Sequence, residues 1–210
     1  MIPRLAVASK NPDKIREIED VLRPMGIADE IVQGLDWPDV EETGETLEEN
    51  AAIKARAVAE ATGLPAIADD TGLEVEALGG EPGVHTARFA GPDATYDENV
   101  TRILEVMEGV SHRVARFRTV VALVFPDGVE IVAEGSVDGV ITEAKRGSRG
   151  FGYDPVFEVK GRTLAEMTAD EKNELSHRAR AIRALGGSLG LSGAGDSVLF
   201  HDIGKACRET

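Results

Sequence analysis

The centre of this chain reads Ala66-Ile67-Ala68-Asp69-Asp70-Thr71-Gly72-Leu73. A short apolar run, bounded by turn residues, leads here into two adjacent carboxylates, a hydroxyl and a glycine. Such a run predicts a buried strand. Open α/β sheets place their chemistry beyond the carboxyl ends of their strands, so we expect a functional site where this run meets the carboxylates.

Asp69 and Asp70 should have different roles, because successive residues of a strand point to opposite faces. Two carboxylates beside Gly72 suit a hard cation such as Mg2+, which takes one or two carboxylates together with substrate phosphates. The alternative is a solvated turn, since Asp and Gly are common turn residues. This stretch by itself leaves both interpretations open.

Length and charge narrow the class of protein. The 210 residues, 42% of them hydrophobic, fit one large α/β domain or a domain with an inserted lobe. With 38 acidic against 23 basic residues the net charge is -15, so the chain as a whole repels nucleic acid and anionic lipid. Any polyanionic ligand must therefore meet locally concentrated Lys and Arg, or a metal ion.

Cysteine content and hydropathy indicate the compartment. Cys207 is the single cysteine, which excludes a disulfide framework and a cysteine-rich zinc site. The first residues carry no apolar region typical of a signal peptide, and no apolar stretch approaches transmembrane length. We therefore expect a cytoplasmic protein that has neither a nucleic-acid polymer nor a membrane as partner.

A strand and a helix are predicted near the N-terminus. Leu5–Ala8 is a short apolar strand, and apolar residues then recur at helical spacing over 15–25. Asn11 is a good N-cap, Pro12 fits the first helical position, and Gly26 supplies a stop. These residues predict a helix that begins directly after a strand end.

Lys14 is unusual in this helix, because a cation in the first turn opposes the helix dipole. It is explained if an anion binds at that N-terminus, where backbone N–H groups already point outward. The alternative is an exposed lysine tolerated at small cost. Ser9, Asn11 and Lys14 all follow a strand end, which favours the anion site.

A second helix is predicted after an acidic segment over 36–49. Thr46 and Glu49 form a capping box for this helix, and Gly63 ends it. Asn50 and Lys54 lie four residues apart and hence on one face. The acidic segment is expected to be a solvated loop, unless it folds back over Asp70.

The second half of the chain alternates predicted elements with glycine-rich loops. The glycine- and proline-rich passage over 79–91 is a loop of unusual length, which is typical of functional loops, and 146–155 is a second glycine-rich stretch. The remaining predicted elements are a helix capped by Thr95 and Glu98, a hairpin over 116–133, a strand over 137–141, and a helix capped by Thr168 and Glu171 that runs to Leu185.

Basic and acidic side chains from these loops and helix starts indicate a phosphate ligand. Cations beside a carboxylate-held Mg2+ are the equipment that binds a polyphosphate. Phe151 and Tyr153, next to Gly152, offer aromatic faces for a base, although core packing is the better explanation of these two residues taken alone. Sugar phosphates, pyrophosphate and nucleotides all remain open at this point.

Seven motifs together resemble one known family. They are Ser9-x-Asn11-x-x-Lys14, Glu41-Glu42-Thr43-Gly44, Glu49-Asn50-Ala51-x-x-Lys54-Ala55, Ala68-Asp69-Asp70-Thr71-Gly72-Leu73, Pro82-Gly83-x-x-Thr86-Ala87-Arg88, Phe151-Gly152-Tyr153-Asp154-Pro155 and Ser176-His177-Arg178. In this order, from about Arg4 to Leu185, they resemble the inosine/xanthosine triphosphate pyrophosphatase family, also called Ham1-like. Any one motif is weak, whereas the ordered set is specific.

The resemblance implies an α/β fold with two lobes around a long, twisted mixed sheet and an active site in the cleft between them. It implies a Mg2+-dependent enzyme that splits deaminated purine triphosphates (ITP, dITP and XTP) into monophosphate and pyrophosphate, and it implies a homodimer. The corresponding domain covers 1–186. Residues 187–210 form a tail of unknown role.

Roles are carried over from the family to the matching positions. Asp70 is the implied general base, and Glu41 and Asp70 are the implied metal ligands. The implied substrate-binding residues are Ser9, Lys10, Asn11, Pro12, Asp13, Lys14, Lys54, Thr71, Phe151, Gly152, Tyr153, Asp154, Lys172, His177 and Arg178.

Base selection is expected to depend on the oxygen at C6, where adenosine has an amine. A donor from His177 or Arg178 would pair with this oxygen and would reject adenine. On one straight helix Lys172 and His177 would be splayed by about 140°. We therefore expect the helix to break near Ser176.

Two rival functions remain open. One is a Maf-like pyrophosphatase of pyrimidine or modified nucleotides, for which the opening motif at Ser9 is unsuited. The other is a nucleotide-binding module without turnover. The acids Glu41, Asp69 and Asp70 argue against it, because a pure binder of a triphosphate gains little from extra negative charge.

Overall fold

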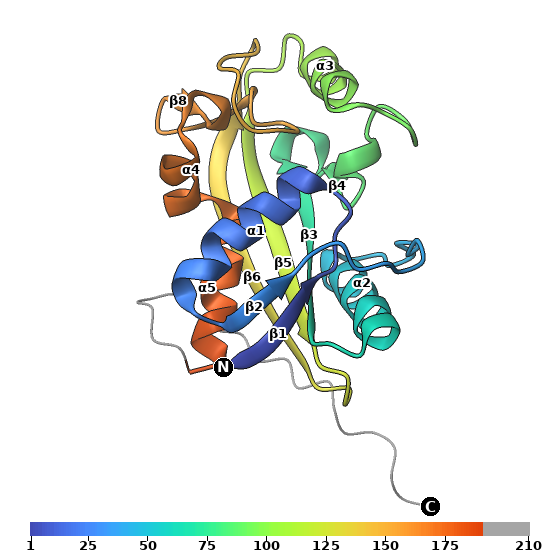
Figure 1. The fold of residues 1–210 in the computed structure, drawn as a ribbon. Coiled ribbons are helices and arrows are strands. Elements are labelled where there is room, and N and C mark those ends of the chain that lie inside the picture. Colours follow the sequence, from blue (N-terminus) through green and yellow to red (C-terminus); the bar gives the residue numbers. More distant parts are fainter. Residues whose placement is uncertain (191–210) are drawn as a thin grey trace, which may run out of the picture.

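One long mixed sheet organises the molecule (Figure 1). The computed structural model describes residues 1–190, so Cys207 and most of the predicted tail lie outside the described residues. The sheet has eight strands in the order β2-β1-β3-β5-β6-β7-β8, with β4 paired to β3. The strands are β1 (Ile2–Val7), β2 (Ala28–Val32), β3 (Ala66–Val75), β4 (Pro82–Gly83), β5 (Val114–Val124), β6 (Glu130–Ile141), β7 (Phe157–Val159) and β8 (Arg162–Thr163).

The helices begin at the predicted caps, and α1 and α2 also end at the predicted glycines. They are α1 (Pro12–Met25), α2 (Leu47–Thr62), α3 (Tyr96–Val106), α4 (Ala169–Leu175) and α5 (His177–Ser188), with 3-10 turns η1 (Glu76–Leu78), η2 (Thr86–Arg88) and η3 (Leu164–Glu166). The capping boxes at Thr46 and Thr95 are present, and Gly26 and Gly63 end α1 and α2 in the left-handed conformation. Local side-chain hydrogen bonds therefore fix these boundaries.

The predicted break near Ser176 is confirmed. Lys172 lies in α4 and His177 begins α5, with Ser176 in an extended conformation between them (ψ 151°). The Ser176 hydroxyl oxygen accepts a hydrogen bond from the backbone N–H of Ala179 at 3.3 Å, which caps α5. α5 runs to Ser188, beyond the predicted domain boundary at 186.

Three hydrophobic clusters surround the sheet. α1 and α5 pack on one face of β1, β5 and β6, and α2 packs on the other face (Figure 1). The third cluster joins α3, β7 and η3 to the far ends of β5 and β6. β5 contributes to all three, through Phe117, Val120 and Val121 among others. The long strands therefore carry two lobes, as expected from the resemblance.

The run at 66–73 does not end at the carboxylates, and this corrects the prediction. β3 continues through Asp69 and Asp70 to Val75, because antiparallel β5 accompanies it from Ala66 to Val75. Parallel β1 stops earlier, at Val7. The site therefore lies beyond the carboxyl end of β1, against the middle of β3, and not in a turn.

A second correction concerns the hairpin. The separate strand expected over 137–141 is the continuation of β6, which runs without a break from Glu130 to Ile141 beside β5. Gly135 lies in the middle of this strand, and a Cβ there would be 2.3 Å from the backbone nitrogen of Ala181 in α5. The glycine allows close packing of α5 on the sheet. The sequence did not predict β2, β7 and β8.

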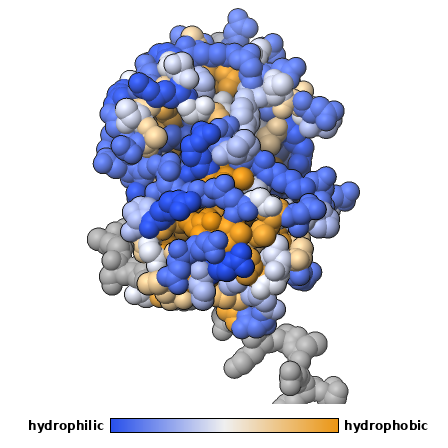
Figure 2. All heavy atoms as spheres, viewed as in Figure 1, coloured by the Kyte–Doolittle hydropathy of each residue, from blue (hydrophilic) through white to orange (hydrophobic). Residues whose placement is uncertain are grey.

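The surface is mostly polar. Figure 2 shows hydrophilic residues over most of the visible face, with hydrophobic residues gathered below α1, over β1 and β2. Within residues 1–190, no helix is both long and apolar enough to cross a membrane.

Candidate active site

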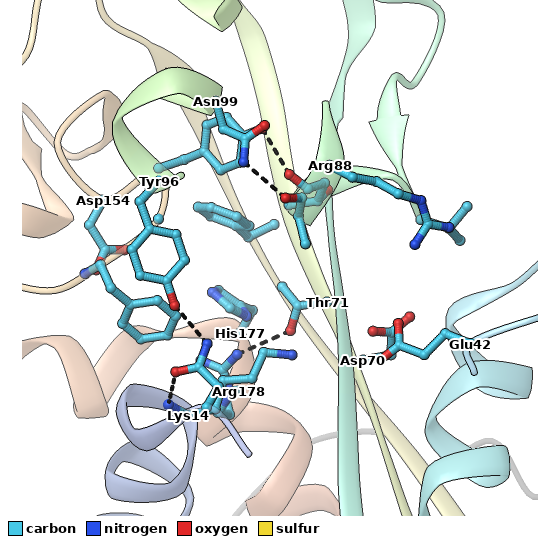
Figure 3. A pocket seen from close by; sticks show the side chains of 18 of the residues that line it. Lys14, Glu42, Asp70, Thr71, Arg88, Tyr96, Asn99, Asp154, His177 and Arg178 are labelled. Atoms are coloured by element: carbon cyan, nitrogen blue, oxygen red, sulfur yellow. Dashed lines mark hydrogen bonds between the residues drawn. The ribbon is translucent and has the colours of Figure 1, made fainter. Parts of the chain in front are cut away.

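A cleft opens between the lobes and receives side chains from nearly every element around it. Figure 3 shows these side chains converging from the start of α1, the middle of β3, η2, α3 and the start of α5. Of the predicted site residues, the cleft is lined by Asn11, Lys14, Asp70, Thr71, Phe151, Gly152, Tyr153, Asp154, Lys172, His177 and Arg178.

The turn before α1 presents an N-terminus to the cleft. Asn11 accepts hydrogen bonds from the backbone N–H groups of Asp13 and Lys14 at 3.0 and 3.4 Å, and the Ser9 hydroxyl oxygen accepts one from Asn11 at 3.2 Å. Lys10 differs from the expectation, because it is exposed, pairs with Asp39 and does not line the cleft. Pro12 starts the helix.

Asp69 and Asp70 point to opposite faces of the sheet, as the alternation of a strand predicts. Asp69 is buried against α1 and α5, where its Oδ2 lies 3.3 Å from Lys14 Nζ and 2.9 Å from Arg178 Nη2. Burial alone would raise the pKa of the Asp69 carboxyl, but the charges of Lys14, Arg178 and Lys54 outweigh it and hold this pKa below its ordinary value. Asp69 therefore stays ionised and orders the cations around it.

Asp70 faces α2. Its carboxylate oxygens accept hydrogen bonds from Lys54 at 3.1 Å and from Asn50 at 3.4 Å. Burial raises the pKa of Asp70, and the nearby charge of Lys54 only partly offsets this effect. Of the two neighbours, Asp70 is thus the carboxylate whose environment favours taking up a proton, which is the property of a general base.

The acidic loop folds back over Asp70, but it brings Glu42 and not Glu41. Glu42 lines the cleft and pairs with Lys54 at 2.8 Å, whereas Glu41 is exposed and does not line the cleft. The backbone N–H of Gly44 donates to the side-chain oxygen of Asn50 at 2.8 Å and anchors the loop on α2. A Cβ at Gly44 would lie 2.6 Å from Glu49 Cβ, so a larger residue could not take this position.

An ion network joins α1 to the far side of the cleft. Lys172 Nζ donates to Asp154 at 2.5 Å and lies 2.7 Å from Glu17, which also pairs with Arg178. The charges of Arg178 and Lys172 lower the pKa of Glu17 against the opposing effect of burial. Burial raises the pKa of Asp154, against the charge of Lys172.

This network supports the aromatic side of the cleft. Lys172 Nζ and Arg178 Cζ lie 5.0 and 5.7 Å from the centre of the Phe151 ring. Asp154 accepts a hydrogen bond from the backbone N–H of Phe151 at 2.8 Å. Tyr153 is buried and donates to the backbone oxygen of Thr86 at 2.9 Å, so it ties the two loops together.

A chain of two hydroxyls links Asp69 to the ring of His177. When Thr71 donates its single proton to the Asp69 carboxylate at 3.2 Å, the 2.6 Å contact between the Thr71 and Thr119 hydroxyls uses the proton of Thr119. Thr119 then accepts the Nδ1–H of the His177 ring at 2.5 Å. In this arrangement the Nε2 atom of His177 carries a lone pair.

The charge state of His177 agrees with this arrangement. Burial lowers the pKa of His177 well below its ordinary value, and the charges of Arg178 and Lys172 add to this effect. A neutral ring with Nδ1 protonated is an acceptor toward the cleft. The expectation that His177 donates to the base requires the other tautomer and stays a prediction.

Among residues 1–190, one N–H group of Arg178 has no hydrogen-bond partner. Its Nε and Nη2 groups donate to Asp69, Nη2 also donates to Thr71, and Nη1 donates to Glu17. A guanidinium has five N–H groups, so one N–H on Nη1 is left for a ligand. Arg178 is buried and lines the cleft.

Residues 5–187 match the model of the Ham1 family. The chain belongs to the Ham1 family. Relatives described as dITP/XTP pyrophosphatase include one from Methylococcus capsulatus, 50% identical over 89% of this chain and 96% of the relative. Another, from Elusimicrobium minutum, is 47% identical over 87% of this chain and 97% of the relative.

Solved structures of Ham1 proteins share the fold. A HAM1 protein from Coxiella burnetii superimposes with a TM-score of 0.81 at 41% identity, over 91% of this chain and 100% of that chain. The Staphylococcus aureus Ham1 protein gives a TM-score of 0.77 at 38% identity, over 89% of this chain and 98% of that chain. The mixed sheet with two lobes is therefore the Ham1 fold.

Sequence reasoning missed several residues of this Ham1 cleft. Glu17 lies one turn after Lys14 on the same face of α1, and this spacing could have identified it. Thr119, which contacts His177, lies within an apolar strand, and the sequence does not reveal that Tyr96 at the start of α3 and Arg88 in η2 reach the cleft. Within residues 1–190, Arg88 is the cation lining the cleft that has no carboxylate partner.

Proposed function

We propose that this chain is a pyrophosphatase that hydrolyses deaminated purine nucleoside triphosphates (dITP, ITP and XTP) to the monophosphate and pyrophosphate. The observation that carries the proposal is the difference in surroundings between Asp69 and Asp70. One carboxylate is fixed in ion pairs, and the other lies in the same cleft with a raised pKa, between a helix N-terminus and an aromatic wall. The names of the relatives support the choice of substrate.

The triphosphate is bound, in this proposal, along the α1 side of the cleft. The positive end of the α1 helix dipole and Lys14 provide positive charge on this side. Lys54 adds a cation beside Asp70, and Arg88 adds one from η2. A helix N-terminus with nearby cations is a good site for phosphate oxygens. This local charge overcomes the net charge of -15.

A divalent cation fits the Asp70 side. Glu42 and Asp70 both contact Lys54 Nζ, at 2.8 and 3.1 Å, so two carboxylates converge on one positive charge. No group of three or more His, Cys, Asp or Glu side chains suited to a metal occurs among residues 1–190, but Mg2+ needs only one or two carboxylates when phosphates supply the rest. We propose Asp70 and Glu42 as ligands, in place of Glu41. When bound, Mg2+ would neutralise phosphate charge.

Asp70 accepts the proton of the attacking water. A water between Asp70 and the α-phosphorus loses this proton as it attacks, and pyrophosphate leaves with the electrons of the broken bond. Lys54 holds the Asp70 carboxylate in place at 3.1 Å, and Asn50 holds its second oxygen. Positioning and charge stabilisation together lower the barrier to this step.

In this proposal Arg178 and His177 recognise the base through hydrogen bonds. The free N–H of Arg178 donates to the oxygen at C6, and Nε2 of His177 accepts the N1–H that hypoxanthine and xanthine carry. Adenine has an amine at C6 and a lone pair at N1, so both interactions become unfavourable. Guanine shares both atoms with hypoxanthine and must be refused at its 2-amino group, near Phe151.

Asp70→Asn tests the catalytic assignment. It removes a charge and the proton acceptor at nearly constant volume, so kcat for dITP is expected to fall by about 10²–10⁴-fold. Asp29→Asn in β2 is the matched control, because Asp29 is exposed and far from the cleft residues. Pyrophosphate release at saturating MgCl2 is the assay, with circular dichroism to confirm the fold. Activity of Asp70→Asn within tenfold of wild type would contradict the role of Asp70.

Assembly as a homodimer, the absence of nucleic-acid and membrane partners, and a cytoplasmic location stay predictions of the sequence.

A further inference from the structure

Tyr96 bridges the two lobes across the mouth of the cleft. Tyr96 is the first residue of α3, a helix that packs in the same hydrophobic cluster as β7 and η3. Its hydroxyl accepts a hydrogen bond from Asn11 Nδ2 at 2.6 Å (Figure 3). Asn11 belongs to the other lobe and caps α1 with its Oδ1 atom. One Asn11 side chain thus joins the phosphate-binding turn to Tyr96.

The ring of Tyr96 lies against Phe151. The two ring centres are 5.7 Å apart and the ring planes make an angle of 42°. A flat base that stacks between two parallel rings needs ring centres about 7 Å apart, because each stacking contact takes about 3.5 Å. A base cannot lie between Phe151 and Tyr96 until Tyr96 moves outward and turns.

The other neighbours of Phe151 are fixed. Lys172 and Arg178, near the same ring, are buried and each is paired with two carboxylates. Tyr96 is 43% exposed and, among the described residues, its hydroxyl has one hydrogen-bond partner. Of the groups around Phe151, Tyr96 is therefore the one that an entering base can displace at small cost.

We propose that Tyr96 is a substrate-contacting residue that forms the outer aromatic wall of the base site. The inference rests on the proposed function, since it assigns the purine base to Phe151. The base takes the place of Tyr96 on Phe151, and Tyr96 closes over the opposite face of the base. The hydrogen bond to Asn11 holds the ring at the mouth of the cleft, beside the position assigned to the base.

A binding experiment without turnover tests this role. Titration calorimetry measures the Kd of dIMP, a product that keeps the base and one phosphate, and the Kd of inorganic pyrophosphate in the same MgCl2 buffer. Tyr96→Ala is expected to weaken dIMP about tenfold, the size of one lost base–aromatic contact, and to leave pyrophosphate unchanged. Tyr96→Phe keeps the ring and is expected to weaken dIMP by about threefold or less.

Asp97→Ala is the matched control. Asp97 follows Tyr96 in the first turn of α3, is largely exposed and pairs with Lys145, outside the cleft lining. The capping box between Thr95 and Glu98 stays intact in all three variants, so α3 is expected to fold. Asp97→Ala should bind dIMP and pyrophosphate as wild type does.

Four outcomes would overturn the inference. If Tyr96→Ala binds dIMP with a Kd within twofold of the wild-type value, Tyr96 does not contact the base. An equal weakening of dIMP and pyrophosphate, or the same loss in Asp97→Ala, means that Tyr96 acts through the position of α3 or α1. A wild-type protein that binds dIMP no better than dAMP overturns the proposed function itself, and this inference with it.

Discussion

At the scale of single residues, the cleft is organised by how each charge is compensated. The charges of Lys14 and Arg178 lower the pKa of Asp69 against burial, whereas burial raises the pKa of Asp70 despite the charge of Lys54. Burial without full compensation is what turns an ordinary carboxylate into a base. The adjacent aspartates thus differ in function because the alternation of a strand gives them different surroundings.

His177 provides a prediction about pH. Because its pKa in the folded protein is lowered, the unfolded chain takes up a proton below about pH 6.5 that the folded protein does not. The stabilisation from the neutral ring is therefore complete above this pH and is lost as the pH falls. The free energy of unfolding should decrease by about 1.4 kcal/mol per pH unit between pH 6.5 and 5. Urea titrations at several pH values measure it.

The control for this prediction is His177→Gln, which should lack this component of the slope. Nitrogen-15 NMR of the histidine rings adds a direct readout, since protonated and unprotonated ring nitrogens have different shifts. Wild-type His177 should carry its proton on Nδ1 throughout. A ring that is protonated on Nε2, or charged at pH 6, would contradict the proton count through Thr71 and Thr119.

The sequence located most catalytic candidates but not their pairings. The motifs named Asp70 and Lys14, which both line the cleft, and Lys54, which pairs with Asp70. The resemblance named Glu41, whereas the loop, anchored by the hydrogen bond from Gly44 to Asn50, brings Glu42 into the cleft. Tyr96 was missed because nothing local to α3 indicates a partner 85 residues away.

At the scale of elements, caps were predictable and strand ends were not. Asn11, Thr46 and Thr95 fix helix starts through hydrogen bonds to residues two or three positions away, so the sequence contains the whole interaction. β3 and β6 extend past their expected ends because β5 pairs with both along its length. That pairing is a long-range property which local patterns do not contain.

Gly135 tests how closely α5 must approach the sheet. A Cβ at this position would lie 2.3 Å from Ala181 N and 2.4 Å from His177 O, both backbone atoms of α5. Gly135→Ala must push α5 away and with it His177 and Arg178. We expect a loss of about 1–3 kcal/mol in the free energy of unfolding, together with weaker dITP hydrolysis. Urea unfolding and the pyrophosphate assay measure the two effects.

Gly187→Ala is the matched control in α5. Nothing lies within 4 Å of a Cβ at this exposed position, and alanine favours the helix by up to about 1 kcal/mol. Its stability should be equal or higher and its activity unchanged. If Gly135→Ala were as stable and active as this control, the close packing of α5 would not position the site.

At the scale of the whole molecule, the two lobes contribute different chemistry. The lobe of α1, α2 and α5 supplies the helix N-terminus, Lys54 and the carboxylates beside it. The lobe of α3, β7 and η3 supplies Tyr96, Arg88 and part of the aromatic side. The long strands β3, β5 and β6 hold these groups in one cleft. A nucleotide is the ligand whose two ends, anionic and aromatic, match this division.

The measurement that tests this account most directly is kcat/KM for dITP, XTP, dATP, dGTP and UTP with MgCl2, with the products identified. The account predicts that dITP and XTP are split to monophosphate and pyrophosphate with kcat/KM at least about 10²-fold above that for dATP. Equal values for dITP and dATP, a preference for UTP, or release of orthophosphate in place of pyrophosphate would contradict it.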